Sequence, residues 1–164
     1  MEIAVIADTH MPRGRRALPR ECVVRLRAAE LIVHAGDFTG AEALAEIEAI
    51  GPPLVAVHGN VDTAEVRERL PERAEFEAGG ARIGVIHDAG PRRGRLARMR
   101  REFPGADAVV FGHSHLPLHE REDDFQIFNP GSPTERRRAP AHTIGIAEVA
   151  AGRIEFRLIE LTPG

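Results

Sequence analysis

The stretch at residues 3–10 reads IAVIADTH, an apolar run that ends in an acid and an imidazole. Similar apolar runs follow at residues 31–34 and 54–58, and amphipathic segments at residues 19–29 and 41–50 separate the three runs. Short apolar runs predict strands, and amphipathic segments between them predict helices. This alternation is typical of βαβ units around a largely parallel sheet.

The pattern changes to strands after residue 75. Strands are predicted at residues 75–77, 81–87, 108–111, 116–120, 125–128, 143–149 and 153–158, with one helix at residues 94–103. The order predicts an α/β sandwich in which helices flank two packed sheets. The chain has 164 residues and no internal repeat or linker, so we expect a single domain over residues 1–164.

Composition excludes several classes of protein. Hydrophobic residues make up 43% of the chain and charged residues 29%, which is an ordinary globular balance. No apolar run approaches the ~20 residues that span a bilayer, and no basic leader precedes the first strand, so we expect a cytoplasmic protein without a membrane partner. The formal net charge of −3 argues against an obligate nucleic-acid partner. Cys22 is the only cysteine, so any metal must be held by oxygen and imidazole.

Four of the predicted strands end in residues that bind cations. These residues are Asp8 with His10, Asp37, Asn60, and His113 with His115. Ligands gather at the carboxyl ends of strands in open α/β sheets. In extended backbone, residues two apart point the same way, so each of the two pairs is expected to form half of a site. Each residue alone reads as a loop acid or a packed histidine, but their repetition at four strand ends favours a metal centre.

Three glycines stand immediately before these polar residues. Gly36, Gly59 and Gly112 each lack a Cβ, which lets the chain turn sharply off the end of a strand. We therefore expect all three to act as hinges that present the ligands.

These segments and His87 resemble, in order and approximate spacing, the five motifs of the calcineurin-like metallophosphoesterase superfamily. The resemblance spans the chain and implies an αββα fold. The short length, the turn at residues 129–133 and the C-terminal hairpins resemble the small YfcE-like phosphodiesterase branch, which also contains the retromer scaffold subunit.

The resemblance implies two divalent cations, Mn in the first place and Fe, Ni or Zn as alternatives. One cation would be held by Asp8, His10 and His115, and the other by Asn60, His87 and His113, with Asp37 bridging them. Carboxylate and imidazole suit these metals. The residues that would act in catalysis are Asp37, Asn60, His87 and His113.

The implied reaction is hydrolysis of a small phosphodiester, in which a hydroxide shared by the metals attacks phosphorus directly. A non-catalytic metal-binding scaffold that resembles the retromer subunit is the main alternative. A nuclease is less favoured because it would need stacking aromatics, and the chain has 4% aromatic residues with no Trp or Tyr. A homo-oligomer is left open.

Two positions depart from the superfamily pattern. Val61 replaces a histidine that assists the leaving group in many members. Asp62 can substitute for it, but with Glu65 it reads better as a helix N-cap and its capping-box partner. Asp88 follows His87 where the family often has a glycine and a second histidine, and Asp88 is interpreted equally as an acceptor near the metals or a turn residue.

The remaining polar candidates have ordinary interpretations. His34 and His58 are expected to pack structurally rather than to orient ligands. The arginines of the helix at residues 94–103 are expected to form a solvated face opposite Leu96, Met99 and Phe103. Residues 136–138 and Ser132 are left open between substrate contact and a tight turn.

Overall fold

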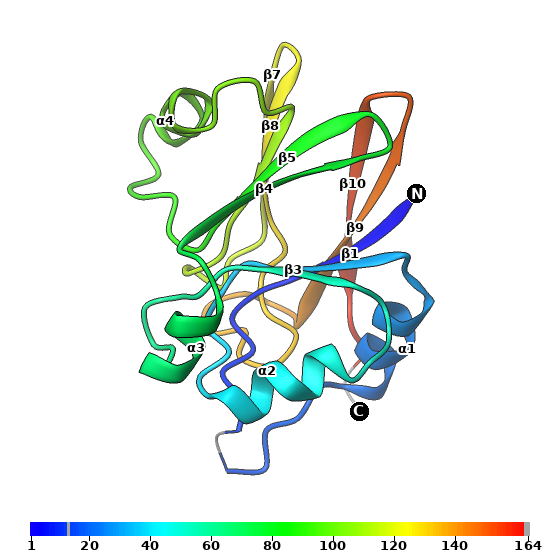
Figure 1. Ribbon diagram of the computed structural model, residues 1–164, viewed down its shortest axis with the longest axis vertical. Coiled ribbons are helices and arrows are strands. Elements are labelled where there is room, and N and C mark those ends of the chain that lie inside the picture. The colour runs from blue at the N-terminus through cyan, green and yellow to red at the C-terminus, as the bar shows by residue number, and fades with distance from the viewer. Residues whose placement is uncertain (13, 163–164) are drawn as a thin grey trace.

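The computed structural model describes residues 1–12 and 14–162 of the chain. The first sheet contains β1 (Glu2–Ile6), β2 (Leu31–His34), β3 (Leu54–Ala56), β9 (Thr143–Ala150) and β10 (Arg153–Glu160). The second contains β4 (Arg73–Ala78), β5 (Ala81–Ile86), β6 (Ala108–Val110), β7 (Leu118–Glu122) and β8 (Phe125–Asn129). The strand orders are β10-β9-β1-β2-β3 and β4-β5-β6-β8-β7 (Figure 1).

Three neighbouring parallel strands occur in each sheet, at one edge of the first and in the middle of the second. β1 pairs in parallel with β2 and β2 with β3, and helices α1 (Arg20–Ala28) and α2 (Ala41–Glu48) connect them. β5, β6 and β8 are also parallel neighbours, whereas β4, β7, β9 and β10 pair antiparallel. The βαβ units that the first half of the sequence predicts are therefore present.

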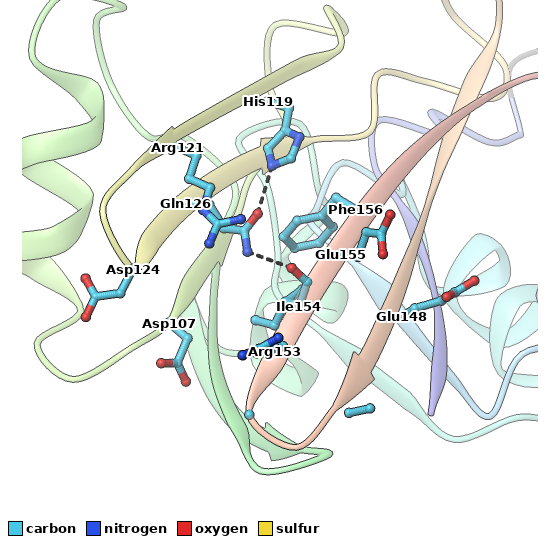
Figure 2. Close-up of a pocket in the computed structure, with 12 residues that line it drawn as sticks. Asp107, His119, Arg121, Asp124, Gln126, Glu148, Arg153, Ile154, Glu155 and Phe156 are labelled. Carbon is cyan, nitrogen blue, oxygen red and sulfur yellow. Dashed lines mark hydrogen bonds between the residues drawn. The ribbon is translucent and has the colours of Figure 1, made fainter.

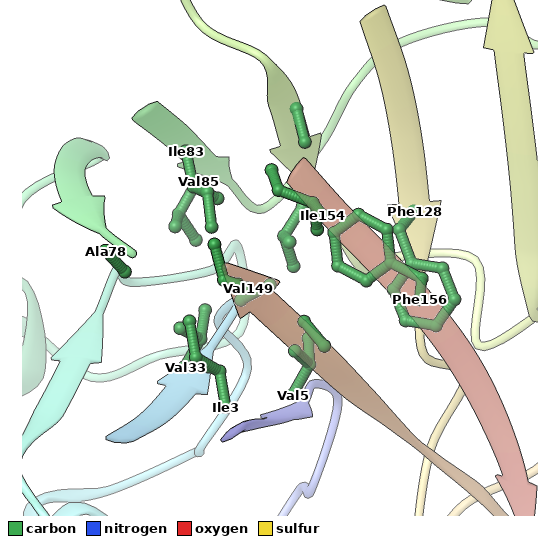
Figure 3. Close-up of a cluster of buried hydrophobic side chains, with 14 of the residues drawn as sticks. Ile3, Val5, Val33, Ala78, Ile83, Val85, Phe128, Val149, Ile154 and Phe156 are labelled. Atoms are coloured by element: carbon green, nitrogen blue, oxygen red, sulfur yellow. The ribbon is translucent and has the colours of Figure 1, made fainter. Parts of the chain in front are cut away.

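The core between the sheets follows from the alternation of side chains along each strand. Ile3 and Val5 of β1 point into the space between the sheets, opposite Ile83 and Val85 of β5 (Figure 3). Ala4 and Ile6 point to the other face, toward the helices. At about 25 cal/mol for each Å² of buried apolar surface, this layer is the main source of attraction between the sheets.

Helices cover the outer face of each sheet. Leu26 of α1 and Leu44 of α2 are fully buried against the outer face of the first sheet. On the second sheet, Met99 of α4 (Arg95–Glu102) and Phe103 pack against Ile127 and its neighbours, as the apolar stripe predicts. The predicted αββα arrangement is confirmed.

The arginines of α4 are not a fully solvated face, contrary to expectation. Arg98 donates to the carbonyl oxygen of Ala89 over 2.7 Å, and Arg95 donates to that of Gly90 over 2.8 Å. These bonds fasten the loop between β5 and α4, whose carbonyls have no sheet partner.

The strands that carry the polar residues are shorter than predicted. β1 ends at Ile6, one residue before the end of its apolar run at residue 7. β3 ends at Ala56, two residues before the end of its run at residue 58. The chain leaves the sheet there, and His58 N donates across to the carbonyl oxygen of Pro71 over 3.0 Å. Among the residues in the ranges 1–12 and 14–162, no helix has the length and apolarity of a membrane span.

Candidate metal centre

Loops at the carboxyl ends of five strands bring the seven predicted ligands together at one end of the sandwich. Asp8 and His10 follow β1, Asp37 follows β2, Asn60 follows β3, His87 follows β5, and His113 and His115 follow β6. The loops of both sheets therefore contribute to one cluster.

Two buried groups within this cluster have the spacing of metal sites. Asp8, His10 and His115 form one, and Asp8, Asp37 and His87 form the other; within each group the ligand atoms lie within 4.8 Å of one another. Asp37 Oδ2 of the second group lies 3.2 Å from His87 Nε2 in its own group and 3.3 Å from His10 Nε2 in the first. A carboxylate so placed can span two cations.

Asn60 and His113 form the solvent-facing side of the cluster. Asn60 Oδ1 lies 3.0 Å from His87 Nε2 and 3.1 Å from His113 Nδ1. The side chain of His113 is 46% exposed, whereas those of Asp8 and His115 are fully buried. A substrate can therefore reach the cluster from the side of Asn60 and His113.

Several buried ligand atoms have no hydrogen-bond partner among the residues that the structure describes. They are Asp8 Oδ2, both ring nitrogens of His10, and His115 Nε2. A buried polar atom without a partner costs roughly 1 to 3 kcal/mol, so native proteins rarely retain several in one place. Carboxylate oxygens and imidazole nitrogens are a suitable donor set for divalent transition metals. The residues present therefore fit the cations that the sequence predicts.

Backbone conformation, rather than extended spacing, makes the paired ligands converge. Asp8 has φ 56°, His10 44°, His113 72° and His115 60°, all in the left-handed region. Asp37 has φ 64°. The prediction that the pairs continue an extended strand is wrong, because the chain has already turned off the sheet where they stand. Positive φ is uncommon in residues with a side chain, and clusters of it mark functional sites.

The three glycines serve two different purposes. Gly36 has φ +91°, as a hinge requires. Gly59 and Gly112 lie outside the left-handed region, so no positive φ requires glycine at these two positions. Glycine is needed at these positions because the structure has no room for a side chain there. A Cβ on Gly59 would lie 2.0 Å from Asp37 Oδ1, and one on Gly112 would lie 2.9 Å from the Cβ of Ala7.

Asp62 is not the cap of α3 (Ala64–Arg69), because Thr63 occupies that position. Instead the buried Asp62 carboxylate accepts backbone N–H groups from Asp37 at 3.0 Å, Thr39 at 2.8 Å and Gly59 at 2.6 Å. The capping-box prediction is wrong, since the turning ligand loops offer three N–H groups that need an acceptor. Asp62 joins the loop of Asp37 to that of Asn60.

The two buried aspartates have opposite pKa shifts. Burial raises the pKa of Asp8 to about 7, with a further rise from the charge of Asp37. Burial also acts to raise the pKa of Asp37, but the nearby imidazoles of His10 and His87 and the N–H of Val61 outweigh it and hold that pKa well below its ordinary value. The pKa of His87 is raised, because its bond to Asp37 and the charges of Asp8 and Asp37 outweigh burial. Asp37 thus stays ionised over the physiological range.

His34 supports the ligand loops by structural packing. Its Nδ1 accepts the N–H of Gly36 at 3.1 Å, which leaves the proton on Nε2 for donation to Thr9 Oγ1 at 3.1 Å. Burial lowers the pKa of His34 to about 3, so the ring stays neutral. The ring also stacks on Phe38 with centroids 3.6 Å apart. The stack on Phe38 is the structural packing that was favoured, and the two hydrogen bonds to residues beside Asp8 and Asp37 are those that the alternative interpretation allows.

The loop that follows β8 holds the Asp8 loop in place. Ser132 Oγ donates to the carbonyl oxygen of Asp8 over 2.8 Å, and Thr134 Oγ1 donates to that of Thr9 over 2.6 Å. Glu135 lies beside His10 and His115. The sequence indicated a turn here through residues 129–133, but gave no signal that its side chains reach the first strand's loop.

Asp88 and Arg136 both bond to backbone groups of their own loops. Asp88 Oδ1 accepts the N–H of Gly90 at 2.8 Å, as a turn residue does, while its Oδ2 lies 4.0 Å from His113 Nε2. Arg136 donates to the carbonyl oxygen of Ala139 over 2.7 Å.

A recess of about 210 Å³ borders the cluster and is lined by Asn60, His87, His58 and Arg67 among others. A larger cavity of about 790 Å³ lies elsewhere, along β7, β8 and the hairpin of β9 and β10. Figure 2 shows its floor, where Gln126 bonds to His119 and to the carbonyl oxygen of Ile154. None of the seven predicted ligands lines this cavity, whereas Asn60 and His87 line the smaller recess.

Comparison with known proteins agrees with this geometry. Residues 1–152 match the model of the calcineurin-like phosphoesterase superfamily domain. The chain is 38% identical over 140 residues to a probable metallophosphoesterase of Methanothermobacter thermautotrophicus, covering 84% of this chain and 80% of that protein. The chain therefore belongs to the calcineurin-like phosphoesterase superfamily, as the motifs indicated.

More distant relatives share the fold. A phosphodiesterase of Methanocaldococcus jannaschii is 25% identical over 80% of this chain and 83% of its own length. The crystal structure of Vps29 from Entamoeba histolytica complexed with Zn²⁺ superposes with a TM-score of 0.76 at 22% identity, over 98% of this chain and 99% of that one. These likenesses confirm the fold that the sequence predicts.

Proposed function

We propose that this protein is a dimetal phosphodiesterase that hydrolyses a small phosphodiester. One observation carries the proposal: donor atoms from both sheets surround Asp37 Oδ2, and several of them are buried without a hydrogen-bond partner. The names of these relatives, a probable metallophosphoesterase and a phosphodiesterase, support the same class of reaction.

The grouping of side chains supports two cation positions. Asp8, His10 and His115 would hold the first cation, Asn60, His87 and His113 would hold the second, and Asp37 would bridge them. We propose Mn²⁺ as the first choice, with Fe, Ni and Zn as alternatives, since all suit imidazole and carboxylate. The Zn²⁺ complex of the Entamoeba Vps29 supports metal binding by this fold.

Bound cations supply positive charge that lowers the pKa of water and neutralises the oxygens of the phosphate. Asp37 stays ionised and would hold the cations, and the exposed Asn60 and His113 leave one side open to substrate. Hydrolysis would form a bond from a water-derived hydroxide to phosphorus as the ester P–O bond breaks, and the leaving oxygen would take its proton from water, with no covalent enzyme intermediate. Val61 is 37% exposed beside Asn60 and has no proton to give, so stable leaving groups are favoured.

The test is hydrolysis of bis(p-nitrophenyl) phosphate by the metal-free protein after addition of Mn²⁺. We expect Asp37→Asn to reduce kcat/KM by a factor of at least about 10², because the bridging charge is lost. Asp124→Asn, an exposed residue of the distant cavity, is the matched control and should keep full activity. Equal activity of wild type and Asp37→Asn would refute the mechanism. An inactive wild type with Mn, Fe, Ni and Zn would favour the scaffold alternative.

A further inference from the structure

Glu135 lies directly behind the two histidines assigned to the first cation. Its Oε2 is 3.5 Å from His10 Nδ1, and both atoms are buried without a hydrogen-bond partner. Its backbone carbonyl accepts a hydrogen bond from His115 Nδ1. One residue therefore faces the Nδ1 atoms of both rings.

The opposite edges of the same rings face the aspartates. His10 Nε2 lies 3.3 Å from Asp37 Oδ2, and His115 Nε2 lies 3.6 Å from Asp8 Oδ1. A neutral imidazole carries one proton, and only the ring nitrogen without it can bind a metal. The carbonyl acceptor keeps the proton of His115 on Nδ1, and the carboxylate 3.5 Å from His10 Nδ1 favours a proton on that nitrogen of His10. Each Nε2 is then free for the cation.

The position of Glu135 is itself fixed by its surroundings. Its backbone N–H donates to Ser132 Oγ over 2.8 Å. Arg16 Nη1 lies 3.5 Å from Glu135 Oε2 and donates to the carbonyl oxygen of His10 over 3.2 Å. The carboxylate is thus held between a guanidinium and an imidazole, and only 22% of its side chain is exposed.

We propose that Glu135 is the positioning residue of the first cation, its carboxylate orienting His10 and its carbonyl orienting His115. The inference rests on the proposed function only in assigning these histidines to a cation. Acceptors of this kind fix the tautomer and the ring orientation of a ligand histidine and raise its basicity, and their loss weakens metal affinity by about 10- to 100-fold.

The first test is titration of the metal-free protein with Zn²⁺ against a chromophoric chelator. We expect Glu135→Ala to weaken one of the two binding constants by about 10- to 100-fold and to leave the other unchanged. Glu135→Gln keeps an acceptor without the charge and should lie between wild type and Glu135→Ala. Glu155→Gln, an exposed glutamate of β10, is the matched control and should bind as wild type does. Unchanged constants in Glu135→Ala would overturn the proposal.

The second test is ¹⁵N NMR of the imidazole tautomers in the metal-free protein. We expect His10 to lose its preference for a proton on Nδ1 in Glu135→Ala, while His115 keeps it because the backbone carbonyl remains. Equal responses of His10 and His115, or none, would contradict the proposal. If Glu135→Ala does not fold, Glu135→Gln carries both measurements.

The two proposals fail in different ways. Metal binding with the expected pattern but no hydrolysis would refute the phosphodiesterase and leave the role of Glu135 intact. Hydrolysis by the wild type, together with unchanged metal binding in the Glu135 variants, would refute the role of Glu135 and leave the phosphodiesterase proposal intact.

Discussion

Left-handed backbone and buried charge both make the individual ligands costly for the fold. Asp8 combines the two, since its φ is 56° and its side chain is fully buried. A non-glycine residue in this conformation costs on the order of 1 kcal/mol or more. Such costs persist where the surrounding bonds fix the conformation, and here Ser132 and His113 hold the Asp8 loop from opposite sides.

Asp8→Asn is expected to stabilise the metal-free protein at pH 8. The pKa of Asp8 is raised from 3.8 to about 7, so the folded state binds this proton more tightly than the unfolded chain does. The stability from Asp8 is therefore fully present below about pH 4 and is lost as pH rises through 7. Removing the charge should raise the free energy of unfolding at pH 8 by up to about 4 kcal/mol, with a smaller gain at pH 5.

The measurement is calorimetric unfolding in a chelator, with Asp124→Asn as the exposed control. Asp8→Asn should also lose affinity for one cation, because an amide cannot replace the carboxylate charge. A metal-free Asp8→Asn protein less stable than wild type at pH 8 would contradict the assignment of buried charge.

At the scale of elements, bonds between loops hold the strand ends in register with one another. Asp62 links the loop after β2 to the loop after β3, and Asp37 Oδ1 in turn accepts the N–H of Val61 at 3.0 Å. The two loops thus brace each other through reciprocal carboxylate bonds to backbone.

Asp62→Ala should destabilise the fold by about 2 to 5 kcal/mol, because it leaves three N–H groups without their acceptor. Asp62→Asn keeps an acceptor oxygen and should cost less. Glu65→Ala is the control, since a capping box would make it costly, whereas the structure gives α3 no side-chain cap. Urea unfolding of the three variants tests this order, and a larger loss for Glu65→Ala than for Asp62→Ala would restore the capping interpretation.

The order of strands and helices could be predicted from the periodicity of the sequence, because a strand or a helix depends on residues a few positions apart. The polar residues at strand ends, such as Asp37 and His87, were visible for the same reason. The roles of Asp62 and Ser132 were not, since their bonds join residues 25 and 124 positions apart and exist only once the loops have met. The left-handed φ of His10 and His115 could not be predicted from the sequence either, because histidine tolerates that region without requiring it.

Across the whole molecule, the candidate metal centre joins the two sheets at the end where the parallel strands finish. Asp8, Asp37 and Asn60 come from loops of the first sheet, and His87, His113 and His115 from loops of the second. Away from this end, packing such as the stack of Phe128 on Phe156, with centroids 4.4 Å apart, holds the sheets together. Bound cations would add bonds across the sandwich and would offset the repulsion between Asp8 and Asp37 within the loops of the first sheet.

Metal loading is therefore expected to raise the Tm of the protein, and chelation to lower it. A ligand that binds only the folded state at 100 times its Kd stabilises that state by about 2.7 kcal/mol, so the shift should grow with the free Mn²⁺ concentration. Asp37→Asn should abolish most of the shift, whereas Asp124→Asn should keep it. Hydrogen exchange should show that loading protects the loops after β1, β2, β5 and β6 together, because one cluster ties them. Protection confined to the loops of one sheet would contradict a centre shared between the sheets.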